Sequence, residues 1–300
     1  MSLMDTVGVF ARNATLLGEI GARTMSPSYM PTEIVSSPKY RLLYPVRSCR
    51  APSSETLRWF PDPGVSGKPI LAEQIMETAI QKIESHLGCI RKPFNLEELW
   101  GRTKPDGQPT SLDEAIGKIY SILTTYASTS NKIDAFLKDY REKSGGRTPF
   151  IDPLVLSRQR FGRDQTRETF DMAMEARAVF SQWVTEVLLR TADSEEIPIL
   201  VFPQSFGTPN YRDTLVKSNI TWDKFSIQSF GYLCGCPDYT IPVGEVPYMS
   251  RITEKEEFLP VSLSMTSKPA HDLILFKILK DLDSEGILQA VGTGPRMFEK

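Results

Sequence analysis

The stretch from Phe230 to Leu282 decides the fold, and it reads FGYLCGCPDYTIPVGEVPYMSRITEKEEFLPVSLSMTSKPAHDLILFKILKDL. It holds two apolar segments, Asp238–Gly244 and Leu259–Ser267, each entered through a glycine or proline. In the first segment, apolar residues alternate with smaller or polar ones, which is typical of a strand buried on at least one face. Pro242 favours an edge strand or an irregular ladder at that point.

A helical pattern follows the second apolar segment. Its apolar residues recur at spacings of three and four, and they are Leu275, Phe276, Leu279 and Leu282. Asp272 is placed to cap this helix. The stretch therefore predicts a strand, a loop, a second strand and a helix.

Short motifs in this unit carry a resemblance to a known family. They are Gly235-Cys236-Pro237, Ile241-Pro242-Val243-Gly244, Leu259-Pro260-Val261-Ser262-Leu263 and Asp272-Leu273-Ile274-Leu275. In this order they resemble the C-terminal signature of the amidase signature family, in the form found in fungal amidases. Near the start of the chain, Asp5, Thr6, Gly8, Ala11 and Arg12 resemble the family's Asp-Thr-x-Gly-x-x-Ala-Arg motif.

The resemblance implies a fold and an organisation. We expect an α/β protein with a mixed β-sheet flanked by helices, a truncated form of the amidase signature fold, in a single domain from residue 1 to residue 300. Without the strands of the family's N-terminal half, apolar sheet edges and helix faces would be uncovered. We therefore expect a homodimer or association with another chain.

The family's catalytic trio of serine, cis-serine and lysine lies upstream of the motif that opens this chain, and no position here matches it. The one local imitation is Lys143-Ser144-Gly145-Gly146, at the end of a charged helix. A nucleophile needs a base from a separate element and donors for the oxyanion. We interpret this tetrapeptide as a turn, with catalysis as the weaker alternative.

Composition excludes several classes of function. The chain has 300 residues, of which 40% are hydrophobic, and 35 basic against 37 acidic residues give a net charge of −2. No overall basic field attracts nucleic acid or an anionic membrane, and no apolar run approaches the roughly 18 residues of a membrane span. We expect a cytoplasmic protein.

The four cysteines are Cys49, Cys89, Cys234 and Cys236. They are too few and too unevenly spaced for a disulfide framework. A zinc site at Cys234 and Cys236 would need further ligands that lie in unrelated contexts, so we expect no metal and no cofactor. We interpret the pair as small residues lining a cavity, with a nucleophilic Cys236 as a weak alternative.

Other elements are predicted from the periodicity of apolar residues and from the positions of glycine, proline and capping residues. Strands are predicted at Arg41–Val46 and Ile197–Phe202, the second entering a loop over Pro203–Pro209. Helices are predicted after Arg12, from Ala72 to Leu87 with Gly88 as a left-handed cap, from Asn95 with Glu98 as a capping box, over Ser111–Tyr126, over Lys132–Lys143 and over Asp164–Arg190. His86 lies out of phase with the Ala72 stripe, so it is predicted on the surface.

A substrate pocket is expected where the strand before Pro203 ends. We predict that its lining residues are Gln204, Ser205, Tyr232, Cys234 and Cys236. Weak candidates for an acid or base are Asp238, Tyr232 and His271. Many members of the family carry asparagine at the position of Tyr232, and a phenol there would reshape the pocket.

Three functions remain open. We favour non-hydrolytic chemistry on a small molecule, such as isomerisation, cyclisation or dehydration in fungal secondary metabolism. The first alternative is a non-catalytic binding or regulatory pseudo-amidase. The second is the C-terminal part of an ordinary amide hydrolase, which converts a carboxamide to an acid plus ammonia or amine.

Overall fold

The computed structural model describes residues 8–25, 38–47, 60–61, 70–128, 133–192, 195–214 and 224–298. Asp5, Thr6 and Cys49 lie outside these ranges. The chain divides into two compact units. The sheet unit contains Val7–Leu99, Val184–Pro209 and Gly235–Lys300, and the helical unit contains Trp100–Trp183 with Asn210–Cys234. The predicted single domain over 1–300 stays a prediction, and each unit is considered by itself.

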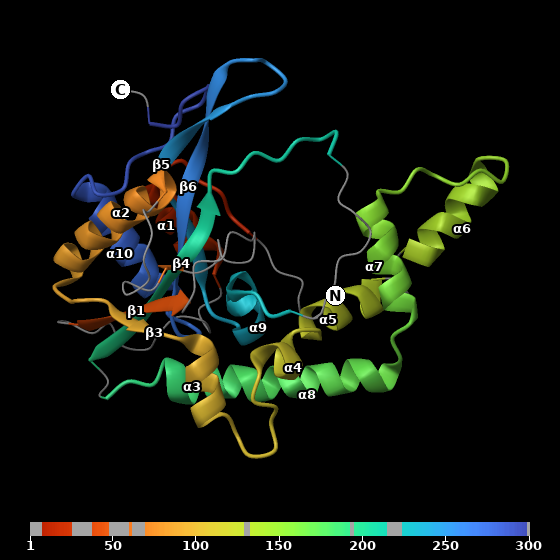
Figure 1. Cartoon of the computed structure of the whole chain (residues 1–300), viewed down its shortest axis with the longest axis horizontal. Helices are drawn as coiled ribbons and strands as arrows, with labels where there is room; N and C mark the ends of the chain where they lie inside the picture. The colour runs from red at the N-terminus through yellow and green to blue at the C-terminus, as the bar shows by residue number, and fades with distance from the viewer. Residues whose placement is uncertain are drawn as a thin grey trace. The chain divides into compact units, whose positions relative to one another are not determined.

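A six-stranded mixed sheet forms the centre of the sheet unit (Figure 1). Its strands are β1 (Lys39–Arg47), β2 (Phe60–Pro61), β3 (Lys92–Phe94), β4 (Glu196–Phe206), β5 (Asp238–Met249) and β6 (Glu256–Thr266). The order is β2-β1-β4-β6-β5, and β3 also pairs with β1. The pairs of β1 with β2, β3 and β4 are parallel, whereas β6 is antiparallel to both β4 and β5.

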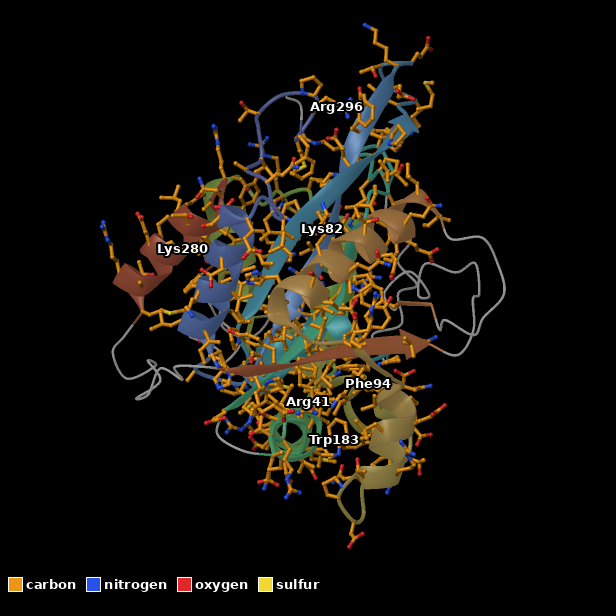
Figure 2. All side chains as sticks on the ribbon, turned by 90° about the vertical axis from the view of Figure 1, so that its left-hand side faces the viewer. Arg41, Lys82, Phe94, Trp183, Lys280 and Arg296 are labelled. Atoms are coloured by element: carbon orange, nitrogen blue, oxygen red, sulfur yellow. The ribbon has the colours of Figure 1, made fainter. Side chains whose placement is uncertain are left out.

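In the described part of the chain, three α-helices lie entirely within the sheet unit, namely α1 (Ala14–Thr24), α2 (Leu71–Leu87) and α10 (Asp272–Ser284). Side chains of α2 and α10 share one apolar cluster with Leu42, Ile199 and Leu263 of the sheet. Figure 2 shows α2 in front of the strands, with Lys82 on its outer side. The apolar stripe predicted from Ala72 is thus buried against the sheet, and Gly88 caps α2 in the left-handed conformation at φ 62°.

The strand pattern of the deciding stretch is confirmed. Tyr239, Ile241 and Val243 of β5 all belong to the apolar cluster or pack against it. The ladder between β5 and β6 is irregular between Pro242 and Gly244, as the proline predicts. In the described chain β5 ends the order of strands, so it is an edge.

The helical unit consists of helices packed around aromatic side chains. These elements are α4 (Leu112–Ile116), α5 (Ile119–Ser128), α6 (Asp134–Lys143), α7 (Pro153–Arg163), α8 (Arg167–Trp183), η5 (Ile227–Ser229) and α9 (Phe230–Cys234), together with the end of α3 (Leu96–Thr103). Trp100 packs edge-on against Trp183 and Phe180, with ring centroids 5.1 and 6.0 Å apart. The indole N–H of each tryptophan is satisfied, by the carbonyl of Pro109 and by Thr103 Oγ1.

Three predicted helices need correction. Asp272 is not the cap of α10: His271 occupies that position, and Asp272 is the first helical residue, where a carboxylate also favours the helix dipole. The helix predicted over Ser111–Tyr126 is two helices, α4 and α5, with Gly117 as the C-cap of α4.

The long helix predicted over Asp164–Arg190 is the third correction. Asp164 instead caps the end of α7, a helix that the sequence analysis missed. The backbone N–H groups of Thr166 and Thr169 donate to each other's hydroxyls, so α8 begins after Thr166. After Trp183 the chain continues as a π-helical turn, Val184–Leu188.

Candidate functional site

The residues predicted for a site fall in different parts of the molecule. Tyr232 and Cys234 belong to the helical unit, whereas Gln204, Ser205 and Cys236 belong to the sheet unit, as do Asp238 and His271. Within the sheet unit, Asp238 and Thr266 lie opposite each other, and Thr266 lies opposite Leu200. Ser205 follows Leu200 by five positions, so it lies about 13–16 Å along the sheet from Asp238.

The structure therefore places Gln204 and Ser205 at one end of the sheet and Asp238 at the other. Ser205 Oγ donates to the carbonyl of Pro260 at 3.0 Å and accepts from the backbone N–H of Gly207 at 3.3 Å. These contacts give the Ser205 hydroxyl a role in fixing the end of β4. A common pocket for all five lining residues stays a prediction.

Asp238 lies at the start of β5, beside two hydroxyl residues of β6. Ser264 Oγ donates to Asp238 Oδ1. Although the residue is exposed, many protein atoms surround its carboxyl, and this desolvation raises its pKa; the Ser264 hydrogen bond opposes the increase. Because the solvent exposure limits the desolvation, we expect a modest shift.

Thr266 shares this side of the sheet with Ser264 and is fully buried. Among the described residues, its Oγ1 has no hydrogen-bond partner. A buried hydroxyl without a partner carries a desolvation cost of about 1–3 kcal/mol. The sequence analysis missed Ser264 and Thr266, although the alternation Ser262-Leu-Ser264-Met-Thr266 is a visible signal for a hydroxyl-lined strand face.

His271 is held in one tautomer. Ser267 Oγ donates to the carbonyl of Pro198 at 2.6 Å, so it must accept from His271 Nδ1–H, which lies 2.9 Å away. Burial and the charge of Lys268 lower the pKa of His271 to about 4. A general base works best with a pKa near the operating pH, so His271 is a poor base in this conformation.

Cys236 is 8% exposed. Burial and the nearby carboxylates of Asp238 and Asp272 raise the pKa of its thiol to about 12. The thiolate is the nucleophilic form, and a thiol with this pKa stays protonated at neutral pH. These surroundings favour the interpretation of Cys236 as a small buried residue over that of a nucleophile.

The remaining sequence candidates have structural contacts. Tyr232 packs on Tyr120, with ring centroids 4.7 Å apart. Ser144 Oγ donates to the carbonyl of Tyr140 at 2.6 Å, and Gly145 and Gly146 both have positive φ angles, so Lys143–Gly146 is a turn, as predicted. Arg12 accepts a backbone hydrogen bond from Val291, and a Cβ atom on Gly8 would meet nothing within 4 Å.

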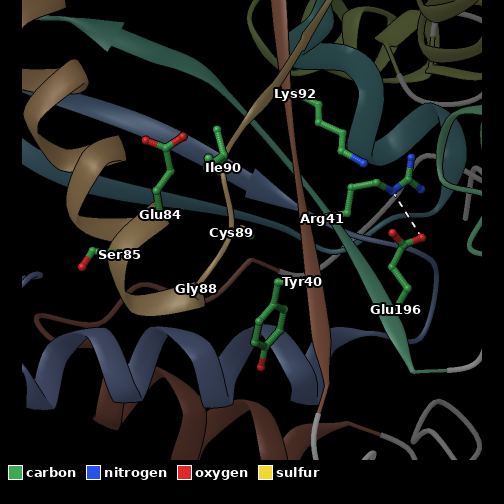
Figure 3. Close-up of a pocket in the computed structure, with 9 residues that line it drawn as sticks. All are labelled: Tyr40, Arg41, Glu84, Ser85, Gly88, Cys89, Ile90, Lys92 and Glu196. Carbon is green, nitrogen blue, oxygen red and sulfur yellow. Dashed lines mark ion pairs between the residues drawn. The ribbon is translucent and has the colours of Figure 1, made fainter.

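The cavities lie elsewhere. One pocket of about 690 Å³ in the sheet unit is lined by Tyr40, Arg41, Glu84, Cys89, Lys92 and their neighbours (Figure 3). Another of about 630 Å³ in the helical unit lies between α4, α5 and α8. Neither is lined by a residue predicted for the site. No group of three or more histidine, cysteine or acidic residues suited to a metal ion occurs in the described ranges.

No protein-family model matches the sequence. Solved structures do match. A 6-aminohexanoate cyclic dimer hydrolase aligns over 95% of this chain and 55% of its own, with 14% identity and a TM-score of 0.54. The urea amidolyase of K. lactis aligns over 91% of this chain and 13% of its own, with 14% identity and a TM-score of 0.54.

A bacterial aryl acylamidase, described as an amidase signature enzyme, aligns over 84% of this chain and 45% of its own, with 11% identity and a TM-score of 0.45. At identities this low, the 6-aminohexanoate cyclic dimer hydrolase and the urea amidolyase establish a shared fold and nothing more. The predicted α/β fold, a mixed sheet flanked by helices, is confirmed. The chain spans about half the length of the first structures it matches.

No helix in the described part of the chain is long and apolar enough to cross a membrane.

Proposed function

We propose that this chain is the C-terminal part of an amide hydrolase of the amidase signature type. In this proposal it forms a hydrolytic site only together with a segment that carries the serine, cis-serine and lysine trio. The observation that carries the proposal is the coverage: 95% of this chain aligns with 55% of a cyclic-amide hydrolase. An alignment over nearly the whole chain is what a part of that fold would give.

The chemistry of the described residues supports the proposal that this chain does not catalyse hydrolysis by itself. His271 is half-buried and neutral at pH 7, and Cys236 is a protonated thiol. The hydrogen bonds of Asp238 and His271 go to Ser264 and Ser267 rather than to each other. A nucleophile needs a base within hydrogen-bond reach. These residues therefore favour a supporting role over independent catalysis.

The proposal includes association with a second polypeptide. In the described chain β5 pairs with β6 alone, so one edge of a twelve-residue strand is available for a further strand. Pro242 and Pro247 limit the hydrogen bonds that this edge can donate. The partner is another chain that supplies the missing half or a second copy of this one, in the cytoplasm of a fungal cell.

A fluorophosphonate probe tests the hydrolase proposal. We expect no labelling of the isolated chain, and labelling together with carboxamide hydrolysis after co-expression with an N-terminal amidase segment that carries the trio. The matched control is the same segment with its nucleophilic serine changed to alanine. Labelling of the isolated chain, or failure of the segment to co-purify and restore hydrolysis, would contradict the proposal.

A repurposed small-molecule site is the second candidate. It rests on Thr266, whose buried hydroxyl lacks a partner in the described chain and lies opposite Asp238. A ligand that accepts from Thr266 and donates to Asp238 would satisfy both groups, as a metabolite of fungal secondary metabolism with adjacent polar atoms would. Ligand density beside these residues in soaked crystals would favour this candidate. A packed site with no catalysis would favour a regulatory pseudo-amidase.

A further inference from the structure

A tail follows α10 over residues 285–298 and returns to the hairpin of β5 and β6. The backbone N–H of Gly292 donates to the carbonyl of Met297 at 2.8 Å, which closes a loop within the tail. Arg296 and Met297 then both contact Glu245 of β5 (Figure 2). None of these contacts takes part in the proposed hydrolysis.

Glu245 has a buried carboxylate whose partners come from the tail. Its side chain is 7% exposed, whereas that of Arg296 is 34% exposed. Arg296 Nε donates to Glu245 Oε1, and the backbone N–H of Met297 donates to Oε2 at 2.9 Å. Among the described residues, no other group bonds to this carboxylate. Because a buried carboxylate without a partner is costly, removal of Arg296 leaves a site that favours another cation.

The ring of Phe258 forms a second wall of the site. Arg296 Cζ lies 3.6 Å from the centroid of this ring. In the ladder, Glu245 lies opposite Pro260 and Pro247 lies opposite Phe258. Residues directly opposite each other share a face of the sheet, as do residues two positions apart on one strand. The pairing of β5 with β6 therefore places the carboxylate and the ring on the same face.

A carboxylate beside an aromatic ring selects a guanidinium over an ammonium group. The guanidinium is planar, so its face can stack on the ring while an N–H at its edge donates to the carboxylate. An ammonium is a compact and strongly hydrated charge, and it has no flat face to stack. A neutral donor would leave the buried charge of Glu245 uncompensated.

We propose that Glu245 and Phe258 form a guanidinium-binding site and that Arg296 is its intramolecular ligand. The tail is thus a strap that closes the site. An arginine side chain of another peptide can take the place of Arg296 when the strap is undocked. The site goes beyond the hydrolase proposal, because it is complete without a second segment and can be tested in this chain alone.

Hydrogen exchange followed by NMR measures the docking of the strap. We expect the Met297 amide to be protected in the wild-type chain, and Arg296→Ala to raise its exchange rate about tenfold or more, because the docked tail loses a charge-assisted hydrogen bond. Arg296→Lys keeps the charge and should raise the rate about threefold. Lys280→Gln, an exposed change on α10 (Figure 2), is the control and should change nothing.

Two outcomes of this experiment would overturn the proposal. A Met297 amide that exchanges freely in the wild-type chain would show that the strap does not dock. An unchanged rate in Arg296→Lys would show that the site does not prefer a guanidinium. Both measurements stand even if the alanine variant fails to fold, because neither depends on it.

Ethylguanidinium tests the class of ligand, because it supplies the atoms that Arg296→Ala removes. We expect calorimetry to show saturable binding to this variant, and roughly tenfold weaker binding of propylammonium, a cation of similar length. The wild-type chain should bind ethylguanidinium more weakly than the variant, because Arg296 competes at a high effective concentration. Adding Glu245→Gln to the variant should abolish binding. Equal binding of the two cations, or binding that survives Glu245→Gln, would overturn the assignment.

Discussion

On strand β6, Val261, Leu263 and Met265 face the apolar core of the sheet unit, whereas Ser262, Ser264 and Thr266 face the opposite side. All six are at most 5% exposed. Burial therefore does not distinguish the two faces, but chemistry does. The core face is stabilised by removal of apolar surface from water, whereas each hydroxyl on the other face needs a hydrogen-bond partner to offset its desolvation.

This difference separates residues that stabilise the fold from residues whose hydroxyl groups are suited to binding a ligand or a partner chain. Leu263 lies in the cluster shared with α2 and α10. Ser264 bonds to Asp238, and Thr266 has no partner among the described residues. The hydroxyl face is thus the part of the strand where a ligand or a partner chain would add most.

The largest effect is expected on the core face. Leu263→Ala removes a fully buried side chain from the apolar cluster and leaves a cavity. We expect a loss of about 3–4 kcal/mol in the free energy of unfolding, measured by urea denaturation with circular dichroism. A loss below about 1 kcal/mol would show that the two faces contribute alike and would break the comparison.

A pH effect of the next size is expected from His271, just beyond the end of β6. Its pKa is about 4 in the folded chain against 6.5 for an unperturbed histidine, so the unfolded chain binds more protons between these pH values. Stability contributed by the neutral imidazole is fully present above pH 6.5 and is lost as the pH falls toward 4. Allowing for partial exposure, the loss is roughly 2 kcal/mol.

His271→Gln removes this titration while keeping a donor for Ser267. We expect the difference in unfolding free energy between the variant and the wild type to change between pH 6.5 and 4 and to stay flat from pH 7 to 8. Denaturation curves at half-unit steps of pH would measure it. A flat difference over the whole range would show that His271 titrates normally in the folded chain.

The sequence predicted the fold far better than the site. The alternation of apolar and polar residues in Asp238–Gly244 and the periodic apolar stripe of α2 are local signals. Both were sufficient to predict the element, because each reflects burial of one face against the same core. The prediction of one long helix from Asp164 was wrong because Asp164 caps the end of α7 and Thr166 caps the start of α8. These two caps outweigh the continuous apolar period.

The pocket shown in Figure 3 left no such signal. Arg41 and Lys92 lie 51 positions apart in the sequence, and the parallel pairing of β1 with β3 brings them together. Likewise, the raised pKa of Cys236 depends on burial and on two carboxylates, neither of which follows from Cys-Gly-Cys spacing. Asp238 is only two residues from Cys236, but the burial of the thiol and the approach of Asp272 at the start of α10 are tertiary effects that no local pattern encodes.

A smaller loss is expected for Ser267→Ala, at the polar continuation of β6. The hydroxyl of Ser267 bridges the carbonyl of Pro198 and Nδ1 of His271, and it is fully buried. Its removal leaves two groups without this partner, which costs about 1–2 kcal/mol. Chemical denaturation at pH 7 measures the loss. Ser267→Thr, which keeps the hydroxyl, is the control, and an equal loss in both variants would indicate a purely steric role.

Asp238→Asn tests the charged member of the hydroxyl face. The folded pKa of Asp238 lies above the 3.8 of an unperturbed aspartate, so the folded chain binds more protons than the unfolded chain just above that pH. This group therefore lowers stability as the pH rises through the folded pKa. Asparagine removes the cost. We expect stabilisation by less than about 1 kcal/mol at pH 7, since exposure screens the charge. Marked destabilisation in denaturant titrations would indicate that a partner requires the carboxylate.

The smallest effect is expected for Thr266→Val, which replaces the unpartnered hydroxyl by a methyl group of similar size. If no group outside the described residues satisfies Oγ1, the isolated chain should be unchanged or slightly stabilised, within about 0.5 kcal/mol. A loss of about 1 kcal/mol or more would reveal a hidden partner for the hydroxyl. The same variant also separates the two functional candidates. It should abolish binding of a ligand held by Thr266 and Asp238, whereas it should leave recovery of hydrolysis with the N-terminal segment intact, because that activity needs only the fold of this strand.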